Sequence, residues 1–248
     1  MLRRLVATCA LLLSFSKSGF TELVHHYDQD FLVYRIDPRT DHVALFWQDP
    51  DGQRFGSFRR LRDYLAAHSQ RLVFAMNAGI FSTEIAPLGL HIESGRVLRP
   101  LNLGKGGRGN FYLKPNGVFF IANQKPAIVD ARIFPKLKIK PTIATQSGPL
   151  LVIKGALHPA FRQDSLNRNI RNGVGTTRDG KVVFALSETP VTFYEFATLF
   201  RNILQCDDAL YLDGSLSEVY APDLGYNFLG GDFAGILAVT AATSQNTP

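Results

Sequence analysis

Residues 171–186, with the sequence RNGVGTTRDGKVVFAL, carry the clearest structural signal in the chain. Two strand-forming runs, residues 174–177 and 181–186, flank the dipeptide Asp179-Gly180. An Asp-Gly pair between such runs is typical of a tight β-hairpin. The segment therefore predicts two antiparallel strands joined by a short turn.

The sequence after this hairpin predicts one helix and two buried strands. Thr192 and Glu195 have the spacing of a capping box, and apolar residues follow at helical intervals. The phenylalanines of that helix are expected in the core. Residues 209–212 and 233–239 are apolar runs of strand length, and the first ends at Asp213.

Two further hairpins are predicted earlier in the chain. Residues 31–36 and 42–47 are apolar runs separated by a turn that contains Pro and Asp. Residues 111–113 and 118–122 flank an Asn-Gly dipeptide, which is a strong hairpin signal. We expect each pair of runs to form neighbouring antiparallel strands.

Between these pairs the sequence predicts a helix and a buried strand. Ser57 is placed to cap a short helix that runs to His68, and residues 72–76 form an apolar run. Many short strands with two short helices predict an α+β fold with a mixed, strand-rich sheet. We expect residues 19–248 to form one domain, since no linker or repeat interrupts them.

The amino terminus resembles a secretory signal peptide. Arg3 and Arg4 precede residues 5–15, which are mostly apolar, and a small polar exit follows. The apolar run is short for a permanent membrane span, although an uncleaved anchor or a buried helix would have a similar pattern. We therefore expect residues 1–18 to be removed on export to the periplasm or the medium, leaving no stable membrane insertion.

Composition and charge exclude several classes of protein. The 248 residues are 46% hydrophobic and 19% charged, which is globular and excludes disorder, collagen and coiled coil. The formal net charge of +6 falls to +3 once Arg3, Arg4 and Lys17 are removed, so nothing points to nucleic acid as a partner. Cys206 would then be the one remaining cysteine, expected to be a buried small side chain.

Polar residues interrupt the apolar pattern at four places where chemistry is expected. Asn77 follows a predicted buried strand, Ser147 lies in a Gly-Pro turn, and Arg168 and Arg171 lie in an Asn-rich segment. Asp213 directly follows an apolar run, so its carboxylate should lie at the edge of the core. Ordinary turns and a solvated loop remain alternative interpretations of these four places.

Two other patterns do not support a function. Residues 104–109, GKGGRG, match the dinucleotide-binding spacing but follow no buried strand and precede no predicted helix. The six histidines show no metal-binding spacing. The sequence predicts neither a metal site nor a cofactor.

Four motifs in order resemble the phosphodiester glycosidase domain of the lysosomal uncovering enzyme and its bacterial relatives. They are NAGIF at 77–81, SGPLLVIKG at 147–155, the segment 171–186 and LDGSLS at 212–217. The resemblance extends from about residue 43 to residue 239. The family signature L-D-G-G-x-S is altered here, because the second glycine is lost.

The resemblance implies hydrolysis of a sugar-1-phosphodiester, for example of an N-acetylhexosamine, at the anomeric carbon. The positions that match the family motifs imply Asp213, Arg171 and Asn77 as catalytic residues. Those implied to bind the phosphorylated sugar or glycan are Ser147, Gly148, Arg168, Gly214 and Ser215.

Roles follow from the chemistry of the leaving group. A phosphate ester leaves readily, so stabilising its charge matters more than protonating it. We therefore expect Arg171, with Arg168 second, to bind phosphate oxygens and Asp213 to act as base or nucleophile. Glu188 and Glu218 are candidates for a second carboxylate.

Two other functions remain open at this stage. The chain could be a non-catalytic periplasmic module that binds phosphorylated glycans through the same pocket. It could also be a serine hydrolase that uses Ser147 with His158 and a carboxylate, although it lacks the nucleophile elbow of that class.

Overall fold

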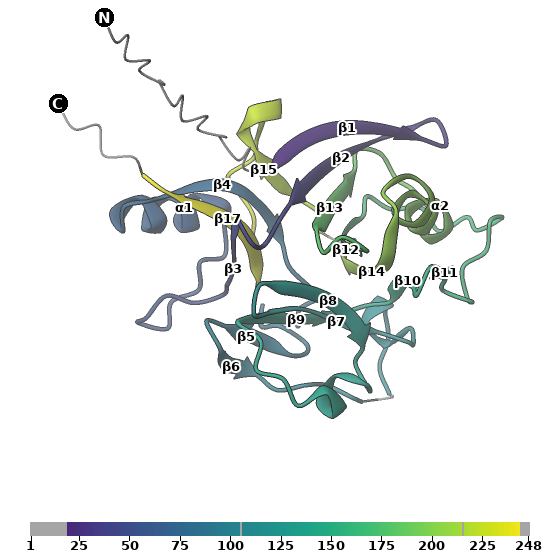
Figure 1. The fold of residues 1–248 in the computed structure, drawn as a ribbon, viewed down its shortest axis with the longest axis horizontal. Helices are drawn as coiled ribbons and strands as arrows, with labels where there is room; N and C mark the ends of the chain where they lie inside the picture. The colour runs from purple at the N-terminus through teal and green to yellow at the C-terminus, as the bar shows by residue number, and fades with distance from the viewer. Residues whose placement is uncertain (1–18, 105, 215, 244–248) are drawn as a thin grey trace, which may run out of the picture.

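A computed structural model describes residues 19–243 apart from residues 105 and 215, so the predicted signal peptide lies outside the described residues. The described chain forms a strand-rich α+β fold with two short helices, as predicted (Figure 1). Its strands form three sheets, and the strand pairs of the described residues are antiparallel where a mixed sheet was expected. One sheet has seven strands and each of the other two has five. No helix among the described residues is both long enough and apolar enough to cross a membrane.

The seven-stranded sheet has the strand order β1-β2-β13-β12-β14-β10-β11, and all its pairs are antiparallel. Its strands are β1 (Phe20–His26), β2 (Gln29–Ile36), β10 (Leu150–Ile153), β11 (Ala156–Leu157), β12 (Asn172–Thr177), β13 (Val182–Ser187) and β14 (Cys206–Asp213).

The second sheet has the order β16-β15-β4-β17-β3, and the third has the order β6-β5-β9-β7-β8. The second is formed by β3 (His42–Phe46), β4 (Gln70–Asn77), β15 (Val219–Ala221), β16 (Tyr226–Asn227) and β17 (Ile236–Ala242). The third is formed by β5 (His91–Glu93), β6 (Arg96–Arg99), β7 (Gly117–Ala122), β8 (Lys125–Asp130) and β9 (Ile143–Ser147).

The helices cover the outer faces of two sheets. Helix α1 (Phe58–Ala67) packs beside β4, and α2 (Phe193–Thr198) continues into a π-helical turn at Leu199–Ile203 (Figure 1). Short 3-10 turns occur at Asn110–Tyr112, Phe134–Leu137 and Pro222–Leu224.

The largest core cluster lies where the three sheets face one another. Phe74 of the second sheet stacks between Tyr34 and Phe184 of the seven-stranded sheet, at ring-centroid distances of 4.2 and 5.4 Å. Phe119 of the third sheet belongs to the same cluster. Since one core is shared by all three sheets, they pack as one unit and fix their strand ends relative to one another.

Several predicted elements are confirmed. Residues 172–177 and 182–187 form the antiparallel pair β12 and β13 around Asp179-Gly180. Ser57 caps α1 by accepting a hydrogen bond from the Arg60 N–H, and Thr192 forms the predicted capping box at α2. Cys206 is buried, and burial raises the pKa of its thiol to about 12.

Two predicted hairpins are wrong. Strand β2 pairs with β1 and β13, whereas β3 pairs with β17 of another sheet. Residues 110–112 form a 3-10 turn, and β7 pairs instead with β8 and β9. The turn between β7 and β8 is formed by Asn123 and Gln124, both with positive φ. The turn after β2 does form, but β2 and β3 join different sheets. Asn116 and Gly117 form no hairpin turn, since neither has a positive φ, and β7 pairs with the following strand β8 and with β9.

Candidate functional site

The candidate site lies where strand ends from all three sheets meet. Asn77 ends β4, Ser147 ends β9 and Asp213 ends β14. Asn172 begins β12, which runs antiparallel to β14, so it lies opposite Asp213 in the ladder. The shared core thus brings together side chains that are far apart in the sequence.

Asp213, Asn77 and Asn172 form one buried hydrogen-bonded group. Asn77 Nδ2 donates to Asp213 Oδ2 at 3.3 Å, and Gly214 N donates to Asp213 Oδ1 at 2.6 Å. Asn172 Nδ2 donates to Asn77 Oδ1 at 2.8 Å, while Asn172 Oδ1 accepts from Asp213 N at 2.7 Å. Asp213 is only 5% exposed, and this group fixes its carboxylate at the core edge, where the sequence predicts it.

Asn77 also holds the segment that follows Asp213. Its Nδ2 donates to the Leu216 carbonyl, and its Oδ1 accepts from Glu218 N at 3.0 Å. Glu218 is half-buried, and burial raises the pKa of its carboxyl. Of the two candidates for a second carboxylate, Glu218 therefore lies beside the site, whereas Glu188 is exposed and its N–H bonds to the Asp30 carbonyl.

Ser147 connects the third sheet to the seven-stranded one. Its hydroxyl donates to the Leu212 carbonyl at 2.8 Å and accepts from Ile80 N at 3.3 Å. His158 is bound elsewhere: its Nε2 donates to the Lys114 carbonyl at 3.1 Å, and its Nδ1 accepts from Ala160 N. The serine and the histidine therefore do not form the nucleophile–base pair that a serine hydrolase needs.

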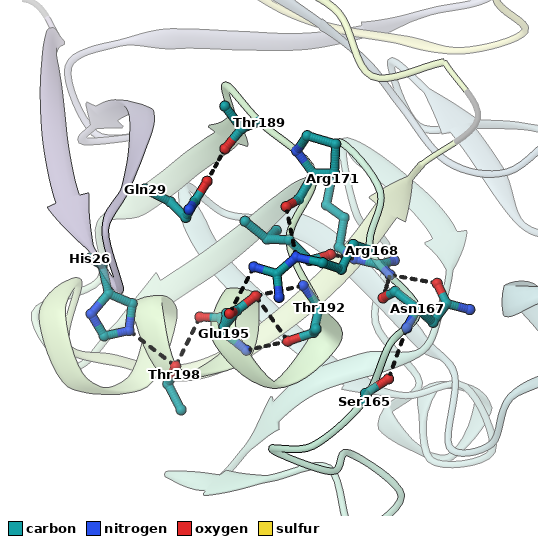
Figure 2. Close-up of polar contacts among 12 residues, drawn as sticks. His26, Gln29, Ser165, Asn167, Arg168, Arg171, Thr189, Thr192, Glu195 and Thr198 are labelled. Atoms are coloured by element: carbon teal, nitrogen blue, oxygen red, sulfur yellow. Dashed lines mark hydrogen bonds and ion pairs between the residues drawn. The ribbon is translucent and has the colours of Figure 1, made fainter.

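Arg171 is fully buried beside the site. Its Nε donates to the Val191 carbonyl at 2.9 Å, and its Nη2 donates to the main-chain and side-chain oxygens of Asn167 (Figure 2). Its Nη1 lies 3.4 Å from the Tyr211 hydroxyl. The guanidinium carbon lies 3.7 Å from the centre of the Phe193 ring. Burial lowers the pKa of this guanidinium, an effect that the nearby Tyr211 opposes.

Arg168 does not join this group. Its Nη2 forms an ion pair with Glu195 Oε1 at 3.0 Å, and its Nε donates to the Pro190 carbonyl (Figure 2). Glu195 is in turn the capping-box residue of α2 and bonds to Thr192. Arg168 therefore anchors the Asn-rich segment to α2, and the phosphate role predicted for it stays a prediction.

The glycines at the site are in close contact with their neighbours. A Cβ on Gly214 would lie 1.8 Å from the Tyr211 hydroxyl, and one on Gly148 would lie 2.5 Å from Asn116 Cβ. Both positions therefore need the small residue for packing, whatever else they do. Ser215 lies outside the described residues.

The glycine-rich segment at 104–109 begins and ends near the site. Asn102 N donates to Gln146 Oε1 at 2.9 Å, next to Ser147, and Asn110 Nδ2 lies 3.5 Å from the Tyr211 hydroxyl. It precedes a three-residue 3-10 turn, a helix too short to present a dinucleotide site. Among the described residues, no group of three or more His, Cys, Asp or Glu is arranged to hold a metal ion.

Sequence reasoning missed Asn172 and Tyr211 as site residues. Asn172 was visible only as one of several polar residues in a loop, and Tyr211 lies in an apolar strand-forming run. The pairing of β12 with β14 is the signal that identifies them. Asn172 lies directly opposite Asp213 in this ladder, and Tyr211 lies two residues before Asp213 on the same strand, opposite Gly173.

Comparison with known proteins identifies the family. The family model for phosphodiester glycosidases matches residues 70–230, which is more than half of the chain and contains all four motifs. The chain belongs to the phosphodiester glycosidase family. An uncharacterized protein of Escherichia coli K12, YigE, is 38% identical over 188 residues, which cover 76% of this chain and 73% of YigE.

Solved structures share the fold at low sequence identity. The zebrafish N-acetylglucosamine-1-phosphodiester alpha-N-acetylglucosaminidase catalytic domain, auto-inhibited by its pro-peptide, is 13% identical with a TM-score of 0.61; the match covers 90% of this chain and 82% of that one. A hypothetical protein from Synechocystis is 16% identical with a TM-score of 0.53, covering 90% and 62% of the two chains. These likenesses establish the fold.

Proposed function

We propose that this protein is a glycosidase that hydrolyses a sugar-1-phosphodiester at the anomeric carbon. The observation that carries the proposal is the buried Asp213 carboxylate, held by Asn77 and the Gly214 N–H at the meeting point of three sheets. Membership of the phosphodiester glycosidase family supports the substrate class. N-acetylhexosamine-1-phosphodiesters are the first substrates to test, because the zebrafish relative is named for one.

Each group has a role in this reaction. Asp213 acts as base or nucleophile toward the anomeric carbon. The Arg171 guanidinium stabilises the charge on the departing phosphate monoester, so a strong general acid is not required. Asn77 and Ser147 hold sugar hydroxyls or phosphate, and Glu218, whose pKa is raised by burial, is the candidate second carboxylate.

A panel of sugar-1-phosphodiesters tests the proposal. We expect the purified protein to release reducing sugar from at least one of them, and the Asp213→Asn variant to lose that activity by a factor of at least about 1000 while its circular dichroism and melting temperature stay close to those of the wild type. Saturable binding without release over many hours would identify a non-catalytic glycan-binding module instead. A fully active Asp213→Asn variant would remove Asp213 from the mechanism.

We also propose that the protein is exported, with residues 1–18 as the signal peptide. The support is the sequence pattern of two arginines followed by a short apolar run. Mass spectrometry of the protein recovered from a secreting host should find a mature amino terminus near residue 19. An intact terminus at Met1 in the cytoplasm would contradict export.

A further inference from the structure

The Tyr211 hydroxyl is surrounded by hydrogen-bond donors. Tyr211 is fully buried on β14, with Arg171 Nη1 at 3.4 Å and Asn110 Nδ2 at 3.5 Å from its oxygen. Neither nitrogen can accept a hydrogen bond, so both point their hydrogens at the phenol oxygen. Among the described residues, no acceptor lies within reach of the phenol's own proton.

The two donors are loosely held. Distances of 3.4 and 3.5 Å are at the long end for hydrogen bonds, so neither contact with the phenol oxygen is strong. Arg171 has five N–H groups, and one on Nη1 has no acceptor in the described part of the chain. In the described chain, the Tyr211 O–H and one N–H of Arg171 Nη1 are therefore donors without an acceptor, which is costly unless an acceptor arrives.

The cluster is also positively charged. Of the described residues, none forms an ion pair with the Arg171 guanidinium, whose partners are carbonyl, amide, hydroxyl and aromatic groups. Burial lowers the pKa of Arg171 and the nearby Glu195 opposes this effect, but its carboxylate is not bonded to the guanidinium. Asp213 lies near enough to add to the effect of burial in raising the pKa of Tyr211, and its carboxylate is not bonded to the guanidinium either. Burial raises the pKa of Tyr211 to about 12, although Arg171 works against this, so the phenol keeps its proton at neutral pH. A buried cation beside protonated donors favours an anion.

The cluster adjoins the reacting carboxylate. The Tyr211 hydroxyl occupies the space where a Gly214 side chain would be, and Gly214 N donates to Asp213. On its other side, Asn110 is half-buried at the end of the exposed glycine-rich segment. The Tyr211 hydroxyl therefore lies between Gly214, next to Asp213, and the half-buried Asn110.

We propose that the Tyr211 O–H, Asn110 Nδ2 and Arg171 Nη1 form a binding subsite for the oxygens of a phosphate or phosphate ester. The choice of phosphate among anions rests on the proposed function, whereas the convergence of donors rests on the geometry alone. Tyr211 is thereby a substrate-binding residue that the sequence motifs do not identify. The phosphate monoester released by hydrolysis is expected to bind at the same place.

Calorimetric titration with inorganic phosphate and with methyl phosphate, at constant ionic strength, tests this subsite without requiring turnover. We expect both to bind the wild type, and Tyr211→Phe to weaken binding about tenfold, as expected for one hydrogen bond to a charged group. Asn110→Ala, at the exposed side of the cluster, should weaken binding by a smaller factor while leaving the fold intact.

Tyr34→Phe is the matched control. Tyr34 is also buried, and its hydroxyl has no hydrogen-bond partner in the described chain, but it lies on β2 stacked on Phe74. This variant should bind phosphate as the wild type does. Equal phosphate affinity in wild type and a folded Tyr211→Phe variant, or no binding by the wild type, would overturn the subsite.

The two proposals fail in different ways. Tyr211-dependent phosphate binding without hydrolysis of any diester would keep the subsite and overturn the proposed function. Hydrolysis that Tyr211→Phe leaves unchanged in both kcat and KM would keep the function and overturn the subsite. Thermal melting of each variant separates loss of binding from loss of folding.

Discussion

The amide side chain of Asn172 joins Asn77 and Asp213 in the candidate site. Asn172 is fully buried, and it donates to Asn77 from one end while accepting from the Asp213 N–H at the other. It thereby ties β4 of the second sheet to β14 of the seven-stranded sheet. Loss of this side chain would leave the buried Asp213 N–H without its acceptor, which destabilises the folded state.

We predict that Asn172→Ala lowers the free energy of unfolding by about 2 kcal/mol and reduces turnover at least about tenfold, because the Asp213 main chain loses its hydrogen bond. Urea unfolding and steady-state assays measure the two effects. Asn227→Ala, whose side chain is exposed and bonds only to the Gly225 carbonyl, should change stability by less than about 0.5 kcal/mol. An Asn172→Ala protein as stable and active as this control would contradict the account.

Among the helices and strands, α2 contacts the arginine segment of the site through its amino terminus. Glu195 closes the capping box with Thr192 and also pairs with Arg168, while the Val191 carbonyl just before the cap accepts from Arg171 (Figure 2). The cap therefore supports both the helix and the segment that carries the two arginines. Helix α1 has a similar cap, Ser57, but lies on another sheet.

The two caps make a matched comparison. Thr192→Ala and Ser57→Ala should each cost about 1 kcal/mol of stability, since each leaves an amide of the first helical turn without its acceptor. Only Thr192→Ala should also impair substrate turnover, because only that cap is bound to the arginine segment. Equal effects of the two variants on kcat/KM would show that the α2 terminus does not position the site.

On the scale of the whole molecule, the buried His158 and the half-buried His26 make the free energy of unfolding depend on pH. Burial lowers the pKa of His158 and of His26 below the ordinary 6.5. In the folded state His158 Nδ1 accepts from Ala160 N, which only the neutral ring can do. Folding therefore favours neutral rings, and unfolded chains bind more protons below pH 6.5.

We predict that the free energy of unfolding is highest above pH 6.5 and falls as the pH is lowered through this value toward the depressed folded pKa values. Glu195, whose pKa is lowered by hydrogen bonds from Thr192 and Arg168 despite burial, loses its contribution only below its ordinary 4.5. Urea unfolding between pH 5 and 7.5 measures the histidine effect apart from that of Glu195, which begins below pH 4.5. His158→Gln should make the free energy of unfolding less dependent on pH in this range. A wild-type free energy of unfolding that does not change between pH 5 and 7.5 would contradict the role given to the histidines.

The fold was predictable where signals were local. The Asp-Gly hairpin and both helix caps depend on residues a few positions apart, so the sequence is sufficient to identify them. The pairing of β2 with β13 and of β3 with β17 depends on which strands share the core, and local turns do not encode that. The first incorrect hairpin arises from this difference, whereas the second fails because residues 110–112 form a 3-10 turn in place of a strand.

The site residues likewise include some that the sequence identifies and some that it does not. Asn77 and Asp213 stand out because a polar side chain ends an apolar strand, and both are at the site. Tyr211 was hidden because its ring belongs to the core and only its hydroxyl reaches the site. Arg168 and Arg171 look equivalent in the sequence, yet one forms an ion pair at α2 and the other is buried.

The position of bond cleavage tests the central claim most directly. Hydrolysis of a sugar-1-phosphodiester in water enriched in oxygen-18 shows which atom is attacked, because a phosphate monoester retains its oxygens under assay conditions. Attack at the anomeric carbon, as Asp213 requires, predicts a phosphate monoester free of the heavy isotope. Incorporation of oxygen-18 into the phosphate would mean attack at phosphorus and would contradict the account.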